Sequence, residues 1–119
     1  RVLGPELVQS LRGRLVNVHP SLLPAFPGLH ASRQALDHGV KVAGVTIHFV
    51  DEGVDTGPVI AQASVPVRDD DTEDSLSARI LLEEHRLYPA VVRLFAEDRL
   101  RLHGRRVAVR GAAEGEASP

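Results

Sequence analysis

Two neighbouring segments, residues 42–50 and 59–67, limit what this chain can fold into. In the first segment, Val45, Ile47 and Phe49 fall on one face of an extended strand, and the residues between them fall on the other face. The second segment also has the pattern of a strand. Because the loop between them is too short for a helical crossover, we expect the two strands to pair antiparallel.

A short strand is predicted over residues 14–18, and we expect it at the centre of the sheet. The stretch NVHPSLLPAF begins at Asn17, inside the end of this strand, and continues beyond it. Pro20 and Pro24 restrict the backbone and remove donors, so an irregular, rigid loop is expected in place of a longer strand. Asn17 and His19 are two positions apart at the strand end, where their side chains should point to the same side. The sequence therefore predicts a polar pair next to a rigid loop.

Shorter elements are predicted on either side of these strands. Residues 5–11 and 32–37 have the pattern of short helices. Ser32 is expected to be the N-cap of the second helix, and Gly39 follows it as a C-terminal stop. Residues 100–109 predict a hairpin.

A long helix is predicted to begin after Thr72, a suitable N-cap, and to run toward Asp98. Pro89 lies inside this helix and removes a backbone donor, so we expect a bend or a break near it. Together with the strands, these helices indicate an α/β fold.

Composition excludes several classes of protein. The 119 residues suffice for one domain with a core, and the formal net charge of −2 gives no basic field for nucleic acid or an anionic membrane. No cysteine is present, which excludes disulfides and thiolate chemistry. The chain begins with Arg1 and contains no methionine, so we expect it to be a piece of something longer.

Four residues, in three places along the chain, could carry chemistry. An amide and an imidazole at Asn17 and His19 could stabilise an oxyanion and shuttle a proton, although such a pair could also serve only to satisfy loop backbone. Asp55 lies in a loop with glycines, where it could orient a histidine, hold a water or bond its own backbone. Glu84 interrupts the apolar stripe of the long helix, so it either binds a ligand or marks the edge of that stripe.

Metal binding is not expected. The chain has six histidines, but none of them are paired at the spacing of a helical zinc motif, and no cysteine is available. Acidic residues gather around residues 51–55, but their spacing is not that of an EF-hand loop.

Two motifs together resemble the folate-dependent formyltransferases: NVHPSLLPAFPGLHA and, further on, GVTIHFVDEGVDTGPVIAQ. The resemblance extends from Arg1 to about Val109. It implies a Rossmann-like mixed sheet of the formyltransferase type, with an antiparallel strand pair and a long C-terminal helix. Residues 1–110 would be the C-terminal catalytic and folate-binding part, and residues 111–119 a disordered tail. The resemblance also implies a cis peptide bond before Pro24.

The same resemblance implies an enzyme that transfers a formyl group from 10-formyltetrahydrofolate, with no metal. It is closest to the members that formylate the amine of glycinamide ribonucleotide in purine biosynthesis. The catalytic trio would be Asn17, His19 and Asp55. Asn17 and protonated His19 would stabilise the oxyanion, while Asp55 would support the imidazolium and a water that relays protons.

Further site residues carry over from the resemblance. The folate-binding residues would be Arg1, Leu3, Val8, Val50, Asp51, Glu52 and Asp55. Glu84 would contact the ribonucleotide, with His30 and His48 lining the site. We expect these two small molecules as partners in the cytoplasm, without nucleic acid or membrane, and the oligomeric state stays open between a monomer and a homodimer.

The family also has an N-terminal half with a glycine-rich loop that binds the substrate phosphate, and nothing in this sequence resembles that loop. Three alternatives therefore stay open. The chain could resemble formyltetrahydrofolate deformylase or methionyl-tRNA formyltransferase more closely in function, or it could be a non-catalytic fragment that binds folate.

Overall fold

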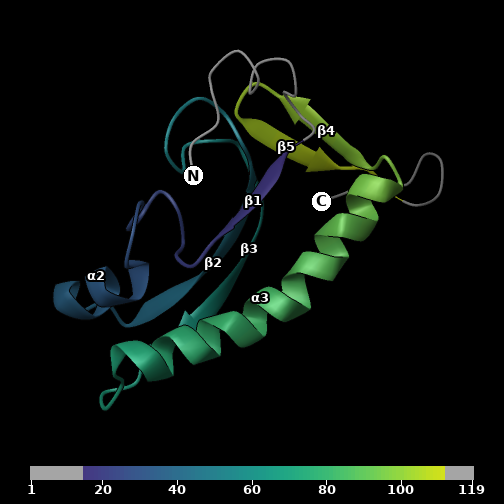
Figure 1. Ribbon diagram of the computed structural model, residues 1–119. Coiled ribbons are helices and arrows are strands. Elements are labelled where there is room, and N and C mark those ends of the chain that lie inside the picture. The colour runs from purple at the N-terminus through teal and green to yellow at the C-terminus, as the bar shows by residue number, and fades with distance from the viewer. Residues whose placement is uncertain (1–14, 112–119) are drawn as a thin grey trace.

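The computed structural model describes residues 15–111, which form a curved five-stranded sheet with one short and one long helix (Figure 1). In chain order the elements are β1 (Val16–His19), α2 (Ala31–His38), β2 (Val42–Phe49), β3 (Val59–Pro66), α3 (Glu73–Ala96), β4 (Leu100–His103) and β5 (Arg106–Val109). The helix predicted at residues 5–11 and residues 112–119 of the predicted tail lie outside the described residues.

The strand order is β1-β2-β3-β5-β4. Neighbouring strands pair antiparallel except β3 and β5, which pair parallel, so the sheet is mixed, as predicted. Within the described residues β1 lies at one edge of the sheet, and our expectation that it would be central was wrong for this part of the chain. β2 lies between β1 and β3 and is buried along almost its whole length, which is the pattern of an interior strand.

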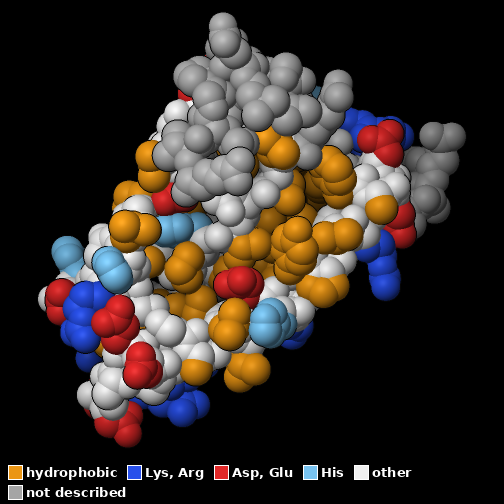
Figure 2. Space-filling model, in the orientation of Figure 1, with side chains coloured by type: hydrophobic (Ala, Val, Ile, Leu, Met, Phe, Trp, Pro, Cys, Tyr) orange, Lys and Arg blue, Asp and Glu red, His pale blue; other side chains and the backbone are white. Residues whose placement is uncertain are grey.

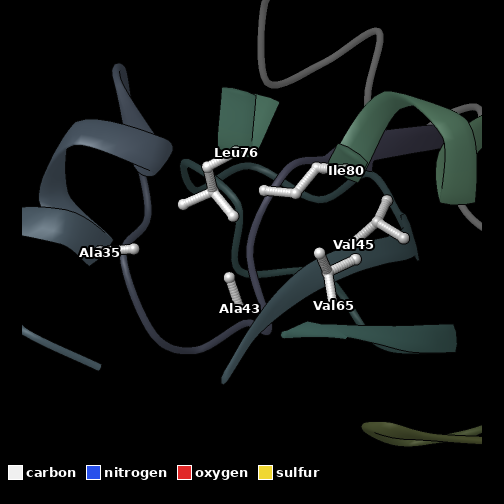
Figure 3. Close-up of a cluster of buried hydrophobic side chains, with 6 residues drawn as sticks. All are labelled: Ala35, Ala43, Val45, Val65, Leu76 and Ile80. Atoms are coloured by element: carbon white, nitrogen blue, oxygen red, sulfur yellow. The ribbon is translucent and has the colours of Figure 1, made fainter. Parts of the chain in front are cut away.

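One face of β2 and β3 packs against the helices, as the alternation in β2 predicts. The main cluster joins both strands to α2 and α3 (Figure 3) and consists of Ala35, Ala43, Val45, Val65, Leu76 and Ile80. A second cluster contains Ile47, Phe49, Ile60 and Val91. Both clusters include residues of α3, so this helix closes the apolar face of the sheet along its length.

The long helix α3 begins as predicted. The Thr72 side chain accepts a hydrogen bond from the Ser75 amide, and the Ser75 hydroxyl accepts one from the Thr72 amide, which completes a capping box. Of the bend or break predicted near Pro89, a break does not occur, because α3 is continuous to Ala96. Leu87 and Val91 pack into the sheet on either side of Pro89, and this packing holds the helix together despite the lost donor.

The short helix α2 ends as predicted and begins differently. Gly39 caps its C-terminus with a φ of 80°, a conformation that suits glycine. The N-cap is His30 and not Ser32, which lies inside the helix. Ser32 is buried and accepts a hydrogen bond from Ser77 of α3, so a tertiary contact takes the place of the predicted cap.

A clamp around Asp71 fixes the entry to α3. Arg79 donates two hydrogen bonds of 2.8 Å to this carboxylate, and the Arg68 amide and Ser75 hydroxyl donate two more. The side chain of Asp71 is only 2% exposed. Hydrogen bonding from Arg79 holds the pKa of the Asp71 carboxyl well below its usual range.

Asp71→Asn is therefore expected to lower the melting temperature at pH 7. A carboxyl whose pKa is lowered by folding contributes stability above its unfolded pKa of about 4, and this contribution declines as the pH falls below that value. The difference in melting temperature between Asp71→Asn and the parent should thus shrink in acid. Asp69→Asn, at a neighbouring side chain that is 98% exposed, is the control. Equal melting temperatures for the two variants at pH 7 would contradict the role of the clamp.

Candidate active site

Strand pairing brings four polar side chains to one face of the sheet. In the register between β1 and β2, Asn17 lies opposite His48 and His19 lies opposite Thr46. Cross-strand partners point to the same face, so all four project away from the apolar face that packs on α3. This register confirms the prediction that the side chains of Asn17 and His19 point to the same side of the strand.

The proline-containing loop covers this polar face and is fastened to it. The buried Thr46 hydroxyl donates to the Ser21 carbonyl at 2.6 Å and accepts from the Leu23 amide at 3.0 Å. Gln62 of β3 donates to the Leu23 carbonyl at 2.9 Å. The peptide bond between Leu23 and Pro24 is cis, as the family resemblance implies. The loop is therefore fixed by buried hydrogen bonds and not only by its prolines.

Asp55 lies between two histidines. Its Oδ2 atom is 3.4 Å from Nδ1 of His19, and its Oδ1 atom is 3.9 Å from Nε2 of His48. The amide of Gly28 donates to Oδ2 at 2.8 Å, and Nε2 of His19 lies 2.9 Å from the Phe26 carbonyl. The side chains of His19, His48 and Asp55 are 7%, 3% and 11% exposed, so the carboxylate and both imidazoles face each other largely out of water.

His48 leaves one nitrogen without a hydrogen bond. Its Nδ1 is 2.8 Å from the Phe49 carbonyl, which can only accept, so Nδ1 carries a proton. Nε2 is then a buried atom with no hydrogen-bond partner among the described residues, and it points toward Asp55 at a distance too long for a direct bond. One bridging water would satisfy both groups, which suits a site that moves protons.

The loop that carries Asp55 is organised by Asp51. The Asp51 carboxylate accepts from the Thr56 hydroxyl at 2.6 Å and from the Gly53 amide at 2.9 Å. Burial raises the pKa of Asp51, but these hydrogen bonds and the charge of Arg105 outweigh it and hold that pKa below its ordinary value. At Gly57 a side chain is excluded, because a Cβ there would lie 1.6 Å from the Phe49 carbonyl oxygen.

Several backbone positions around the site are strained. Phe26, His30 and Asp55 have φ values of 53°, 58° and 56°, in the left-handed region that non-glycine residues avoid. Such conformations cost about 1–3 kcal/mol each and persist only where the surrounding structure holds them. Phe26 and Asp55 lie in the loops that meet at the His19–Asp55 pair, whereas His30 leads into α2 and a fourth such residue, Asp98, follows α3.

The edge strand β1 and the helix α3 border a common hollow. A hollow of about 250 Å³ is lined by Asn17, Glu84 and Tyr88, together with Val16, Val18 and His85. Glu84 also lines a neighbouring hollow of about 320 Å³, which His30 borders as well. In Figure 2, hydrophobic side chains fill the region between α3 and the strands, with acidic side chains and histidines near its edge. The interruption of the apolar stripe at Glu84 therefore coincides with an open surface.

The other predicted site residues do not all lie next to the His19–Asp55 pair. The Val50 amide donates to the Leu15 carbonyl at 2.9 Å, and Glu52 is exposed in the same loop as Asp51. His30 is exposed, with Nδ1 at 4.0 Å from a carboxylate oxygen of Glu73. The three remaining predicted folate-binding residues lie outside the described residues: Arg1, Leu3 and Val8. Backbone groups of Phe26 and Gly28 and the side chain of Arg105 were not predicted.

In this α/β fold, a buried His–Asp pair at a strand end, beside an exposed amide and under a fixed loop, is an arrangement that can carry out acid–base chemistry on a small molecule. The family model described as formyl transferase matches residues 1–92. The chain belongs to the formyl transferase family.

Individual relatives agree with this assignment. Phosphoribosylglycinamide formyltransferase of Escherichia coli is 46% identical over 98% of this chain, and the chain covers 58% of that protein. The crystal structure of glycinamide ribonucleotide transformylase 1 from Symbiobacterium toebii superposes with a TM-score of 0.90 at 58% identity, over 93% of this chain and 52% of the other. A formyltetrahydrofolate deformylase from Pseudomonas syringae has a TM-score of 0.88 at 32% identity, over 93% and 37%.

The chain spans about half the length of the curated bacterial relatives that it matches, 58% for Escherichia coli and 48% for Bacillus subtilis. Within the described residues, no cluster of acidic and histidine side chains is arranged to hold a metal ion. None of the described helices combines the length and apolar character that a membrane span requires.

Proposed function

We propose that the protein transfers the formyl group of 10-formyltetrahydrofolate to the amine of glycinamide ribonucleotide. The observation that carries the proposal is the buried His19–Asp55 pair beside Asn17, in a chain similar throughout to relatives named for this reaction. We further propose that the reaction takes place in the cytoplasm, because both substrates are soluble metabolites.

In the proposed reaction, the amine nitrogen attacks the formyl carbon and a tetrahedral oxyanion forms. The Asn17 amide and protonated His19 would donate hydrogen bonds to this oxyanion, which is where such donors lower a barrier most. The bond between the formyl carbon and N10 then breaks, N10 gains a proton and the attacking amine loses one. Asp55 would orient the His19 imidazole and would hold a water that moves this proton.

The folate would bind near the loop that contains Val50, Asp51, Glu52 and Asp55, with Arg1, Leu3 and Val8 as further contacts. Asp51 supports this role because its hydrogen bonds shape the loop beside Asp55. The ribonucleotide would bind next to Glu84, with His30 at the edge of the same hollow. His48, whose Nε2 atom lies 3.9 Å from Asp55, would support that carboxylate.

An acceptor assay tests the proposed function. The complete gene product is incubated with 10-formyltetrahydrofolate and, in parallel, with glycinamide ribonucleotide, with water alone or with methionyl initiator tRNA. We expect formyl transfer to the ribonucleotide only. Release of formate without an acceptor would identify a deformylase, and no reaction with any acceptor would overturn the proposal of an enzyme.

Glu84→Gln is expected to raise the KM for glycinamide ribonucleotide by about tenfold, since a hydrogen bond to a charged group is worth about 1.5–3 kcal/mol. The KM for the folate should not change, because the folate is proposed to bind near the loop that contains Asp51 and Asp55 and not at Glu84. Glu83→Gln is the matched control, because Glu83 is the preceding residue of α3 and is paired with Arg86. A lower melting temperature with unchanged kinetics would assign Glu84 a structural role.

A further inference from the structure

The hairpin formed by β4 and β5 reaches back to the loop that carries Asp55. β5 pairs with β3 at Arg106 and Val59, so the turn of the hairpin lies beside the point where this loop ends and β3 begins. The hairpin follows residue 96, the end of α3, and lies beyond residues 1–92, where the family model matches.

Arg105 makes this contact. Its guanidinium donates a hydrogen bond to the backbone carbonyl of Thr56, and it also borders a cavity of about 500 Å³ that Asp55 and Thr56 line. Gly104, which precedes it, has a φ of 63° and so allows the tight turn that aims Arg105 at the loop. The positive charge of Arg105 also contributes to the lowered pKa of Asp51.

The contact reaches Asp55 through one peptide. Thr56 is fixed at two points, because its carbonyl accepts from Arg105 and its hydroxyl donates to Asp51. The preceding residue, Asp55, is held with a φ of 56°, a conformation that relaxes unless its neighbours prevent it. In this conformation the Asp55 carboxylate accepts a hydrogen bond from the Gly28 amide at 2.8 Å and lies 3.4 Å from Nδ1 of His19.

We infer that Arg105 is a positioning residue, which holds Asp55 between His19 and His48 by anchoring the Thr56 carbonyl from the β4–β5 hairpin. The catalytic consequence rests on the proposed function. The positioning itself does not, because it is a statement about the conformation of the loop.

Two measurements on the complete gene product test the inference. The first is the NMR chemical shift of the Gly28 amide proton, which reports its hydrogen bond to Asp55 whether or not the protein is active. The second is formyl-transfer kinetics. Arg105→Ala should move the Gly28 amide upfield and lower kcat by about tenfold with little change in KM, since small misplacements of catalytic groups reduce turnover strongly. Arg105→Lys, which keeps a charged donor, should restore both in part.

Arg106→Ala is the matched control. Arg106 is the next residue, is exposed, and makes no side-chain hydrogen bond within the described part of the chain, so neither readout should change. A folded Arg105→Ala with the parental Gly28 shift overturns the inference, whatever its activity. If Arg105→Ala does not fold, Arg105→Gln decides in the same way, because it removes the charge and shortens the donor. If the parent protein does not formylate, the proposed function fails, and the Gly28 shift still tests the positioning.

Discussion

Replacing His19 with alanine is expected to lower turnover by about 100-fold or more, while substrate binding changes far less. Removing one hydrogen-bond donor that faces the developing oxyanion in a buried site lowers kcat by about this factor. His19 meets the requirement of burial, and Asp55 and the Phe26 carbonyl fix its two ring nitrogens. An interaction made mainly in the transition state affects kcat and kcat/KM together. Steady-state kinetics with both substrates varied is the measurement.

The same series should include Asn17→Ala and Asp55→Ala, with losses of similar size. Because the three groups act on one intermediate, the double variant His19→Ala/Asp55→Ala should cost little more than either single variant. His103→Ala is the control, since His103 is exposed at the end of β4. Near-normal turnover for Asn17→Ala would mean that Asn17 does not stabilise the oxyanion, and the proposed roles would have to be reassigned.

The regular parts of this fold could be predicted from the sequence because their causes are local. Alternation in β2 predicts which side chains face α3, and Thr72 predicts the start of that helix, since both depend only on neighbouring residues. Ser32 was predicted to cap α2 on equally local grounds and does not. Its hydroxyl accepts a hydrogen bond from Ser77, which is 45 positions away, and no local sequence pattern predicts such a contact.

The site could be predicted only as a set of side chains. Sequence patterns pointed to His19 and Asp55, and the structure brings them within 3.4 Å of each other. The groups that complete the arrangement are backbone atoms of Phe26 and Gly28, which no side-chain pattern identifies. The proposed role of Arg105 could not be predicted either. It depends on the parallel pairing of β5 with β3, and that pairing depends on contacts throughout the sheet and not on the residues near Arg105.

The largest effect is expected from the length of the chain. Residues 1–119 expressed alone should show no measurable formylation of glycinamide ribonucleotide, whereas the gene product with the upstream half should be active. A phosphate held by backbone donors would position the amine for attack, and such positioning can supply about 7–11 kcal/mol of a barrier. No two glycines in this sequence lie closer together than four positions, so the glycine-rich loop that could hold a phosphate is absent from it.

The isolated chain should also self-associate. Leu81, Tyr88, Val92 and Phe95 of α3 are 46%, 41%, 44% and 40% exposed, and they recur at helical spacing, so they form one apolar stripe on the described part of the surface. An uncovered stripe of this kind favours association with another copy or another apolar surface. Light scattering coupled to gel filtration should show dimers or larger species for residues 1–119, and Val92→Glu should reduce them. Weak folate binding can persist, because the loop around Asp51 does not depend on this stripe. A monomeric 119-residue chain with full activity would contradict both expectations and would require the phosphate to be held by residues of this chain.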